Sequence, residues 1–217
     1  MQGVLSCPAV RKTDSPHSAE SKEVGDEGRL QDVVRFAKYC GITWLHDDSG
    51  FFYQRYPTSE LDHGLDTDDI SGTGTSADKN AMLYFHKLGT RQSEDVLIIQ
   101  DPSHSEYMFG PEFTDDGKYL ILTQTKDTSP SALLWIAEMK DVDLSSEQKV
   151  KETIKWKKIV DKFGGLYTYI ANDGSKFYFM TNDKAPKYKM VTYDLDKADE
   201  VSNTAIRLCP ANVFPNG

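Results

Sequence analysis

The 217-residue sequence has little cysteine, no excess of positive charge and no long apolar run. Cys7, Cys40 and Cys209 are an odd number without metal-site spacing, which favours reduced thiols and a cytoplasmic location. The net charge of −9 argues against nucleic acid or an anionic membrane as a partner, because both select basic surfaces. No run approaches the roughly 18 apolar residues of a membrane span. No basic segment precedes the short apolar start, so a secretory signal is not expected.

Two stretches share single features with ligand-binding loops. In the acidic loop over residues 58–80, Asp66 could open a calcium loop, but Ser71 and Ala77 stand where that motif needs Gly and Glu. The glycine-rich segment Ser71 to Thr75 lacks the lysine of a phosphate-binding loop. We therefore expect solvated turns there, and neither a metal nor a cofactor.

Three stretches carry an Asp- or Asn-rich turn with glycine between two apolar segments. The turn glycines are Gly50, Gly117 and Gly174, within residues 41–57, 108–125 and 166–181. Asp, Asn and Ser bond their own backbone at a bend, and Gly accepts a positive φ without steric cost. The flanking aromatic and β-branched residues suit half-buried strands. Each stretch therefore predicts a β-hairpin.

Two more strands are predicted after each hairpin, at 81–86 and 95–99, at 132–136 and 156–160, and at 189–193 and 205–208. The chain thus reads as an all-β repeat of four-stranded units, which is typical of propeller blades. The predicted blades lie near 41–101, 108–162 and 166–210. Three blades make an incomplete ring, in which the first and the third each lack one neighbour.

Several segments resemble the propeller domain of prolyl oligopeptidase, a family of serine peptidases. They are Trp44-x-His46-Asp47, Phe52-Tyr53-x-x-Tyr56-Pro57, Gly72-Thr73-x-Thr75-Ser76, Leu88-Gly89-Thr90-x-Gln92-Ser93-Glu94-Asp95 and Asp115-Asp116-Gly117-Lys118-Tyr119. The segment 88–95 is the most specific, because a polar loop with this wording has no general structural reason. The resemblance runs from about residue 30 to 207 and implies the middle of a seven-bladed propeller.

The resemblance implies a role in cleaving short peptides after proline. In this family the active site lies in a cavity between the propeller and an α/β-hydrolase domain, and the propeller keeps folded proteins out. Propeller residues that point at the substrate fall on Tyr39, Met108 and Thr128. An aromatic ring and a thioether suit an apolar peptide subsite. Tyr39 and Thr128 stand where phenylalanine and cysteine are expected, so the subsite would be slightly more polar. The implied partners are short proline-containing peptides and the hydrolase domain.

Catalytic machinery is not predicted within this sequence. It contains no Gly-x-Ser-x-Gly, the elbow that carries the family's nucleophile. His46 is expected at a hairpin shoulder, and His86 as a strand-face residue rather than a ligand. The chain by itself should not hydrolyse peptides. The alternative is a stand-alone, non-enzymatic module that binds peptides at its sheet edges.

The remaining segments are polar. Residues 1–29 match nothing in the family, and 8–28 have the composition of a disordered tail, with Ser15-Pro16 as a possible phosphorylation site. Residues 30–39 fit either a strand, which the resemblance favours, or a short amphipathic helix. Residues 141–153 are predicted to be a polar insertion. Lysines around Trp156 suggest either a polyanion site or, as we favour, a strand with Trp156 inward and lysines outward.

Overall fold

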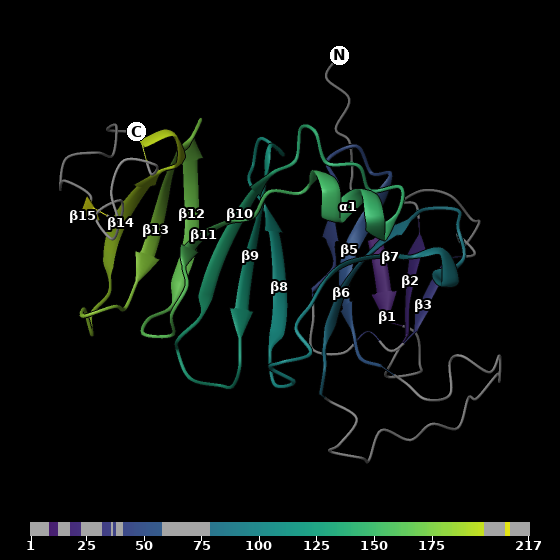
Figure 1. The fold of residues 1–217 in the computed structure, drawn as a ribbon, viewed down its shortest axis with the longest axis horizontal. Helices are drawn as coiled ribbons and strands as arrows, with labels where there is room; N and C mark the ends of the chain where they lie inside the picture. The colour runs from purple at the N-terminus through teal and green to yellow at the C-terminus, as the bar shows by residue number, and fades with distance from the viewer. Residues whose placement is uncertain are drawn as a thin grey trace.

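The computed structural model describes residues 9–12, 18–22, 32–35, 37, 41–57, 79–197 and 207–208. These residues form antiparallel β-sheets that follow one another in chain order (Figure 1). An N-terminal sheet has three strands, β1 (Ala9–Lys12), β2 (Ser18–Lys22) and β3 (Val33–Arg35). Three four-stranded sheets follow, as the sequence predicts, and we call them sheets one, two and three.

Each four-stranded sheet is an up-and-down meander in which consecutive strands pair. Sheet one contains β4 (Thr43–Trp44), β5 (Gly50–Arg55), β6 (Met82–Lys87) and β7 (Val96–Gln100). Sheet two contains β8 (Met108–Phe113), β9 (Tyr119–Thr125), β10 (Leu133–Glu138) and β11 (Lys157–Val160). Sheet three contains β12 (Tyr167–Asp173), β13 (Lys176–Thr181), β14 (Lys189–Asp194) and β15 (Arg207–Leu208). Short 3-10 turns, η3 (Gln92–Glu94) and η4 (Leu195–Lys197), follow β6 and β14.

The three predicted hairpins are confirmed by the strand register. Trp44 lies opposite Phe51 across the first turn. In the second turn Gly117 has φ 68°, and a Cβ there would collide with the ring of His46. The turn of sheet two thus lies directly against the shoulder of sheet one, and only glycine fits both the backbone angle and this close approach.

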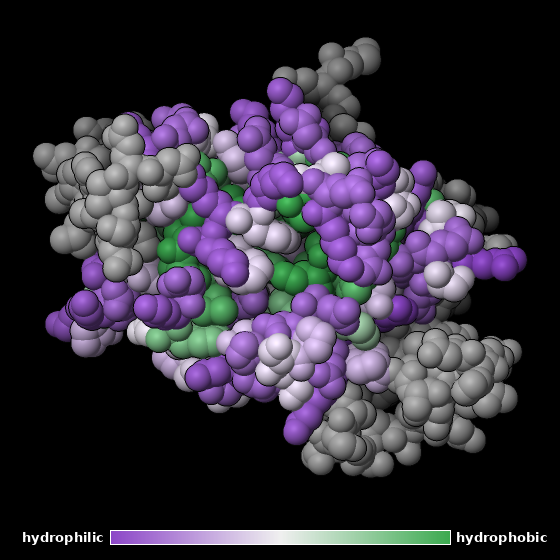
Figure 2. Space-filling view, in the orientation of Figure 1, coloured by the Kyte–Doolittle hydropathy of each residue, from purple (hydrophilic) through white to green (hydrophobic). Residues whose placement is uncertain are grey.

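The sheets pack face to face because side chains alternate between the two faces of each strand. Phe52 of sheet one meets Leu120 and Leu122 of sheet two in one core cluster. Ile121, between those two leucines, points the other way and meets Phe177 of sheet three in a second cluster. Figure 2 shows hydrophobic residues near the middle of the face in view, surrounded by hydrophilic ones. Each core therefore lies between neighbouring sheets.

The N-terminal sheet corrects two expectations: that residues 8–28 are disordered, and that sheet one lacks a neighbour on this side. Residues 9–12 and 18–22 are paired strands, although their composition predicts disorder. The strand expected within 30–39 is confirmed as β3, which pairs with β2. Val34 of β3 is buried against Phe51 and Tyr53, so sheet one does have a neighbour on this side. Composition does not report backbone pairing, and here β2 pairs with both β1 and β3. Ser15 and Pro16 lie outside the described residues.

A helix stands where a polar insertion was expected. Helix α1 (Glu147–Thr153) begins at Ser146, whose hydroxyl accepts a hydrogen bond from the Lys149 backbone N–H at 3.3 Å. Val150 and, just after the helix, Ile154 are buried in the core between sheets one and two. Apolar residues four apart therefore turn this polar segment into a cover for the core. In the part of the chain that the structure describes, no helix is long and apolar enough to cross a membrane.

Candidate functional site

Two of the three predicted substrate-facing residues lie at one rim of the sheets. Met108, the first residue of β8, pairs with Thr125, the last residue of β9. The loop 126–132, which carries Thr128, leaves the sheet at this point. The loop 161–166 before β12 reaches the same rim, which is the lower edge in Figure 1. We call Met108 and these two loops the Met108 rim.

Tyr39, the third predicted residue, lies outside the described residues. The chain leading to it is placed by a single backbone bridge between Ala37 and Arg55. Arg55 is the last residue of β5, and the antiparallel order puts this end of β5 on the same side as the start of β4. The chain therefore passes this side of sheet one two residues before Tyr39.

The Met108 rim combines a thioether, a hydroxyl and aromatic rings. Met108 is half-buried and Thr128 is exposed. Tyr107 stacks on His104 with ring centroids 4.5 Å apart and meets Phe163 edge-on at 5.5 Å. The Lys126 ammonium lies 4.7 Å from the centre of the Phe163 ring. The rings and the thioether offer apolar contacts at this rim, beside the charged residues of the two loops.

The opposite rim contains a buried polar network. The Asp95 carboxylate accepts a hydrogen bond from the Tyr53 hydroxyl at 2.5 Å and lies 2.6 Å from His86 Nδ1. The Asp95 and His86 side chains are both 0% exposed. Because a carboxylate only accepts, the imidazole proton that faces it lies on Nδ1. Gln92 adds a donor to the Tyr53 oxygen at 3.0 Å.

Hydrogen bonds account for Gly89, Gln92 and Asp95 of the segment 88–95, which stands out because a polar loop of this sequence has no general structural reason. Burial, and then the charge of Asp95, raise the pKa of Tyr53. The hydroxyl therefore stays protonated and donates the hydrogen bond to Asp95. Asp32, from the N-terminal part of the chain, accepts from the Gly89 backbone N–H at 2.9 Å. Both ends of the segment are therefore tied to other elements by hydrogen bonds.

His86 was predicted to be a strand-face residue rather than a ligand, and it does face sheet one's buried side. Its Nε2 is buried and has no hydrogen-bond partner among the described residues. His46 is exposed, with its ring 5.9 Å from that of Phe113. Among the residues that the structure describes, no group of three His, Cys, Asp or Glu side chains could hold a metal.

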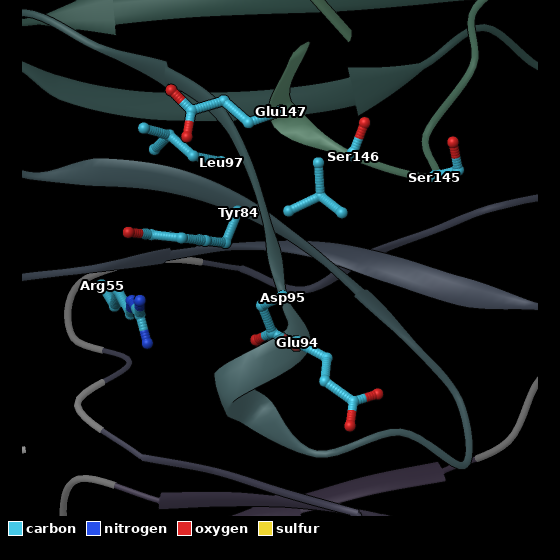
Figure 3. Close-up of a pocket in the computed structure, with 9 residues that line it drawn as sticks. Arg55, Tyr84, Glu94, Asp95, Leu97, Ser145, Ser146 and Glu147 are labelled. Carbon is cyan, nitrogen blue, oxygen red and sulfur yellow. The ribbon is translucent and has the colours of Figure 1, made fainter. Parts of the chain in front are cut away.

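A pocket of about 380 Å³ lies between the outer strand of sheet one and the start of α1 (Figure 3). Its lining residues are Arg55, Tyr84, Glu94, Asp95, Val96, Leu97, Ser145, Ser146 and Glu147. Several of its charged groups already have partners within the chain. The Arg55 guanidinium lies 3.8 Å from the centre of the Tyr84 ring, and Glu147 pairs with Lys151 at 2.5 Å. None of the predicted site residues lines this pocket.

Of the strand arrangement predicted around Trp156, the structure shows β11 beginning at Lys157, one residue after Trp156. Trp156 is half-buried against the core between sheets one and two. The Lys158 ammonium lies 4.3 Å from the centre of the Trp135 ring, and Lys157 donates to the Leu195 carbonyl at 2.6 Å. These charges are therefore spread over separate partners.

Comparison with known proteins identifies the sheets. Residues 17–207 match the family model described as prolyl oligopeptidase, N-terminal beta-propeller domain, so the match begins before the expected start near residue 30. Prolyl oligopeptidase A of Amanita bisporigera is 42% identical over 191 residues, which are 88% of this chain and 24% of that protein. A dual function macrocyclase-peptidase of Galerina marginata is 44% identical over 195 residues, 90% of this chain and 24% of its own.

The likeness extends to three dimensions. Prolyl oligopeptidase B from Galerina marginata, bound to a 25mer macrocyclization substrate, superposes with a TM-score of 0.73 at 36% identity. The match covers 92% of this chain and 26% of that one. The chain thus spans about a quarter of the length of the curated relatives it matches.

Proposed function

Because the chain belongs to the prolyl oligopeptidase N-terminal β-propeller family, we propose that it forms the propeller side of a peptide cavity. The reaction is cleavage of short peptides after proline by a serine peptidase. Tyr39, Met108 and Thr128 face the substrate, and the nucleophile comes from a hydrolase domain outside this sequence. The propeller's narrow channel admits a thin chain and keeps folded proteins out, so selection by size needs no chemistry of its own.

One observation carries the proposal: the β8–β9 register puts Met108 and the loop of Thr128 at one rim. The two residues lie 20 positions apart in the sequence: Met108 begins β8, and Thr128 follows the end of β9, which is paired with Met108. Their chemistry fits an apolar peptide subsite, since a thioether adapts to the shape of its contacts. The rings of Tyr107 and Phe163 extend this surface along the rim.

Binding and cleavage of a fluorescent peptide with a central proline test the proposal. We expect the purified chain to bind the peptide without cleaving it. Met108→Ala should weaken binding about fourfold, because it removes apolar contact worth about one methylene group. Met139→Ala is the matched control, since Met139 is also half-buried but follows β10 at the opposite rim. Its effect per folded molecule should stay within about twofold.

Two outcomes would contradict the proposal. Cleavage that survives repurification and is blocked by a serine-directed inhibitor would show a nucleophile within this chain. Binding that is unchanged in Met108→Ala would favour recognition at a sheet edge, as in a stand-alone interaction module.

A further inference from the structure

The first strand of sheet two has one free edge. Among the residues that the structure describes, β8 pairs with β9 on one side only, and it lies near β4 and β5 of sheet one. Buried backbone groups need partners. Two side chains of sheet one provide them: Gln54 Oε1 accepts from the Phe109 N–H at 2.5 Å, and Thr43 Oγ1 donates to the Pro111 carbonyl at 2.8 Å. The backbone groups of successive residues point alternately to the two edges of a strand, so those of residues 109 and 111 lie on the same edge.

Gln54 is well suited to fix a neighbouring backbone. Its side chain is fully buried, and its Nε2 donates to the Tyr56 hydroxyl at 3.3 Å. The amide is therefore held at both of its polar atoms. Its acceptor contacts the residue that directly follows Met108, so a side chain of a central strand in sheet one is bonded to the start of β8.

A second amide does the same at the junction of sheets two and three. Asn182 Oδ1 accepts from the Leu166 N–H at 2.7 Å, and its Nδ2 donates to the Pro130 carbonyl at 2.9 Å. Pro130 is two residues after Thr128. The same loop is joined to sheet three by the Ala132 N–H, which donates to the Gly165 carbonyl at 3.0 Å. Asn182 thus connects two loops of the Met108 rim.

We propose that Gln54 and Asn182 are positioning residues, which hold Met108 and the Thr128 loop in the arrangement that binds peptide. The proposal rests on the function proposed above. Neither amide touches the substrate. Each crosses a junction between sheets and bonds the backbone one or two residues from a residue that does. Rotation of one sheet against its neighbour would therefore displace a substrate contact.

Gln54→Met tests this role, because it keeps the length of the side chain and removes the acceptor. Gln124→Met is the matched control: Gln124 is equally buried, at 1% exposed, and lies directly opposite Phe109 on β9, but its Nε2 has no hydrogen-bond partner among the described residues. Three readouts are followed on the full chain: hydrogen exchange of the Phe109 amide, the NMR signal of the Met108 methyl group, and peptide affinity.

In Gln54→Met we expect Phe109 exchange to be about tenfold faster and peptide affinity about two- to tenfold weaker, as for loss of one net hydrogen bond. The Met108 methyl signal should move. In Gln124→Met all three readouts should stay close to wild type, even if both variants lose similar stability. If Gln54→Met lowers stability but leaves the Met108 signal and the affinity of the folded fraction unchanged, the positioning role is wrong.

Two further results separate a failure of the positioning role from a failure of the proposed peptide-binding function. If the wild-type chain binds no peptide, the proposed function fails, and the Met108 signal alone decides whether Gln54 positions this residue. If Gln54→Met does not fold, Asn182→Leu takes its place. It should move the Thr128 methyl signal and weaken peptide binding by a similar factor, while an unchanged Thr128 signal would overturn the proposal.

Discussion

The two rims of the sheets differ in how far the local sequence marks their important residues. At the rim of residues 88–95 the sequence is unusual, and the structure places Tyr53, His86 and Asp95 there in a buried network. At the Met108 rim the residues are ordinary, and nothing in their local sequence marks them. The distinctive sequence at one rim therefore reflects the packing of buried polar groups. At the other, the proposed function depends on where strands end.

The energetic contrast between the rims follows from burial. Removing one partner from a buried polar network leaves the others without water and without a hydrogen bond. A half-buried methionine or an exposed threonine can change without such a penalty. Substitutions at the 88–95 rim should therefore act on stability, and substitutions at the Met108 rim on binding.

The largest effect is expected for Asp95→Ala. It leaves the Tyr53 hydroxyl and His86 Nδ1 buried without their acceptor, so the free energy of unfolding should fall by about 3 kcal/mol or more. Urea unfolding measures this loss. Glu94→Ala, at the exposed neighbouring position, should stay within about 0.5 kcal/mol. Equal losses in the two variants would contradict the network's role.

Gly117→Ala should have the next largest effect. The residue has φ 68°, and its new Cβ would meet the His46 ring, so we expect a loss of about 2 kcal/mol. Gly174→Ala is the comparison, because Gly174 has φ 57° but no atom within 4 Å of a built Cβ. It should cost only about 1 kcal/mol, for the backbone angle alone. Equal thermal shifts in the two variants would show that the contact with His46 is unimportant.

Sheet three should drive self-association, because one of its faces carries exposed apolar side chains. Ile170 is 45% and Met180 37% exposed, and Met180 pairs with Met190 on the next strand. Exposed apolar patches mark interfaces or aggregation sites. Met180→Lys should weaken self-association about tenfold, the equivalent of one buried apolar side chain. Sedimentation equilibrium at several concentrations measures it, and a wild-type chain that stays monomeric would refute the expectation.

The smallest effect concerns pH. Partial burial of its carboxylate, and then the charge of Asp115, raise the pKa of Glu112 above its ordinary value of 4.5, although the residue as a whole is exposed. Ionised Glu112 therefore opposes folding at neutral pH, and this penalty is lost as the pH falls through the raised pKa. Glu112→Gln should stabilise the chain at pH 7 by a few tenths of a kcal/mol, because the side chain is exposed and its charge is screened. The gain should vanish near pH 4; a constant gain across this range would contradict the ionisation argument.

The hairpins and the order of strands could be predicted because their signals are local. An acidic turn with glycine between apolar strands needs no knowledge of the rest of the chain. Helix α1 was missed because only Val150 and Ile154 carry its apolar pattern within a polar segment. Strands β1 and β2 were missed because the segment 8–28 has, as a whole, the polar composition of a disordered tail.

The candidate site was predictable only in part. Met108 and Thr128 came from a family resemblance, and the structure adds that their positions share a rim. The Asp95 network joins residues up to 42 positions apart, so no local pattern could reveal it. Gln54 did carry a signal. It follows Phe52 by two residues and so shares the inward face of β5, where a polar side chain needs a specific partner.

The central claim is that peptide binds at the Met108 rim and that the 88–95 rim is structural. NMR titration of the full chain with a proline-containing peptide tests it most directly. We expect signals of Met108 and of the loops 126–132 and 161–166 to move with a single affinity, while those of residues 88–95 and α1 stay in place. Signal changes confined to residues 88–95 and α1 would contradict the account.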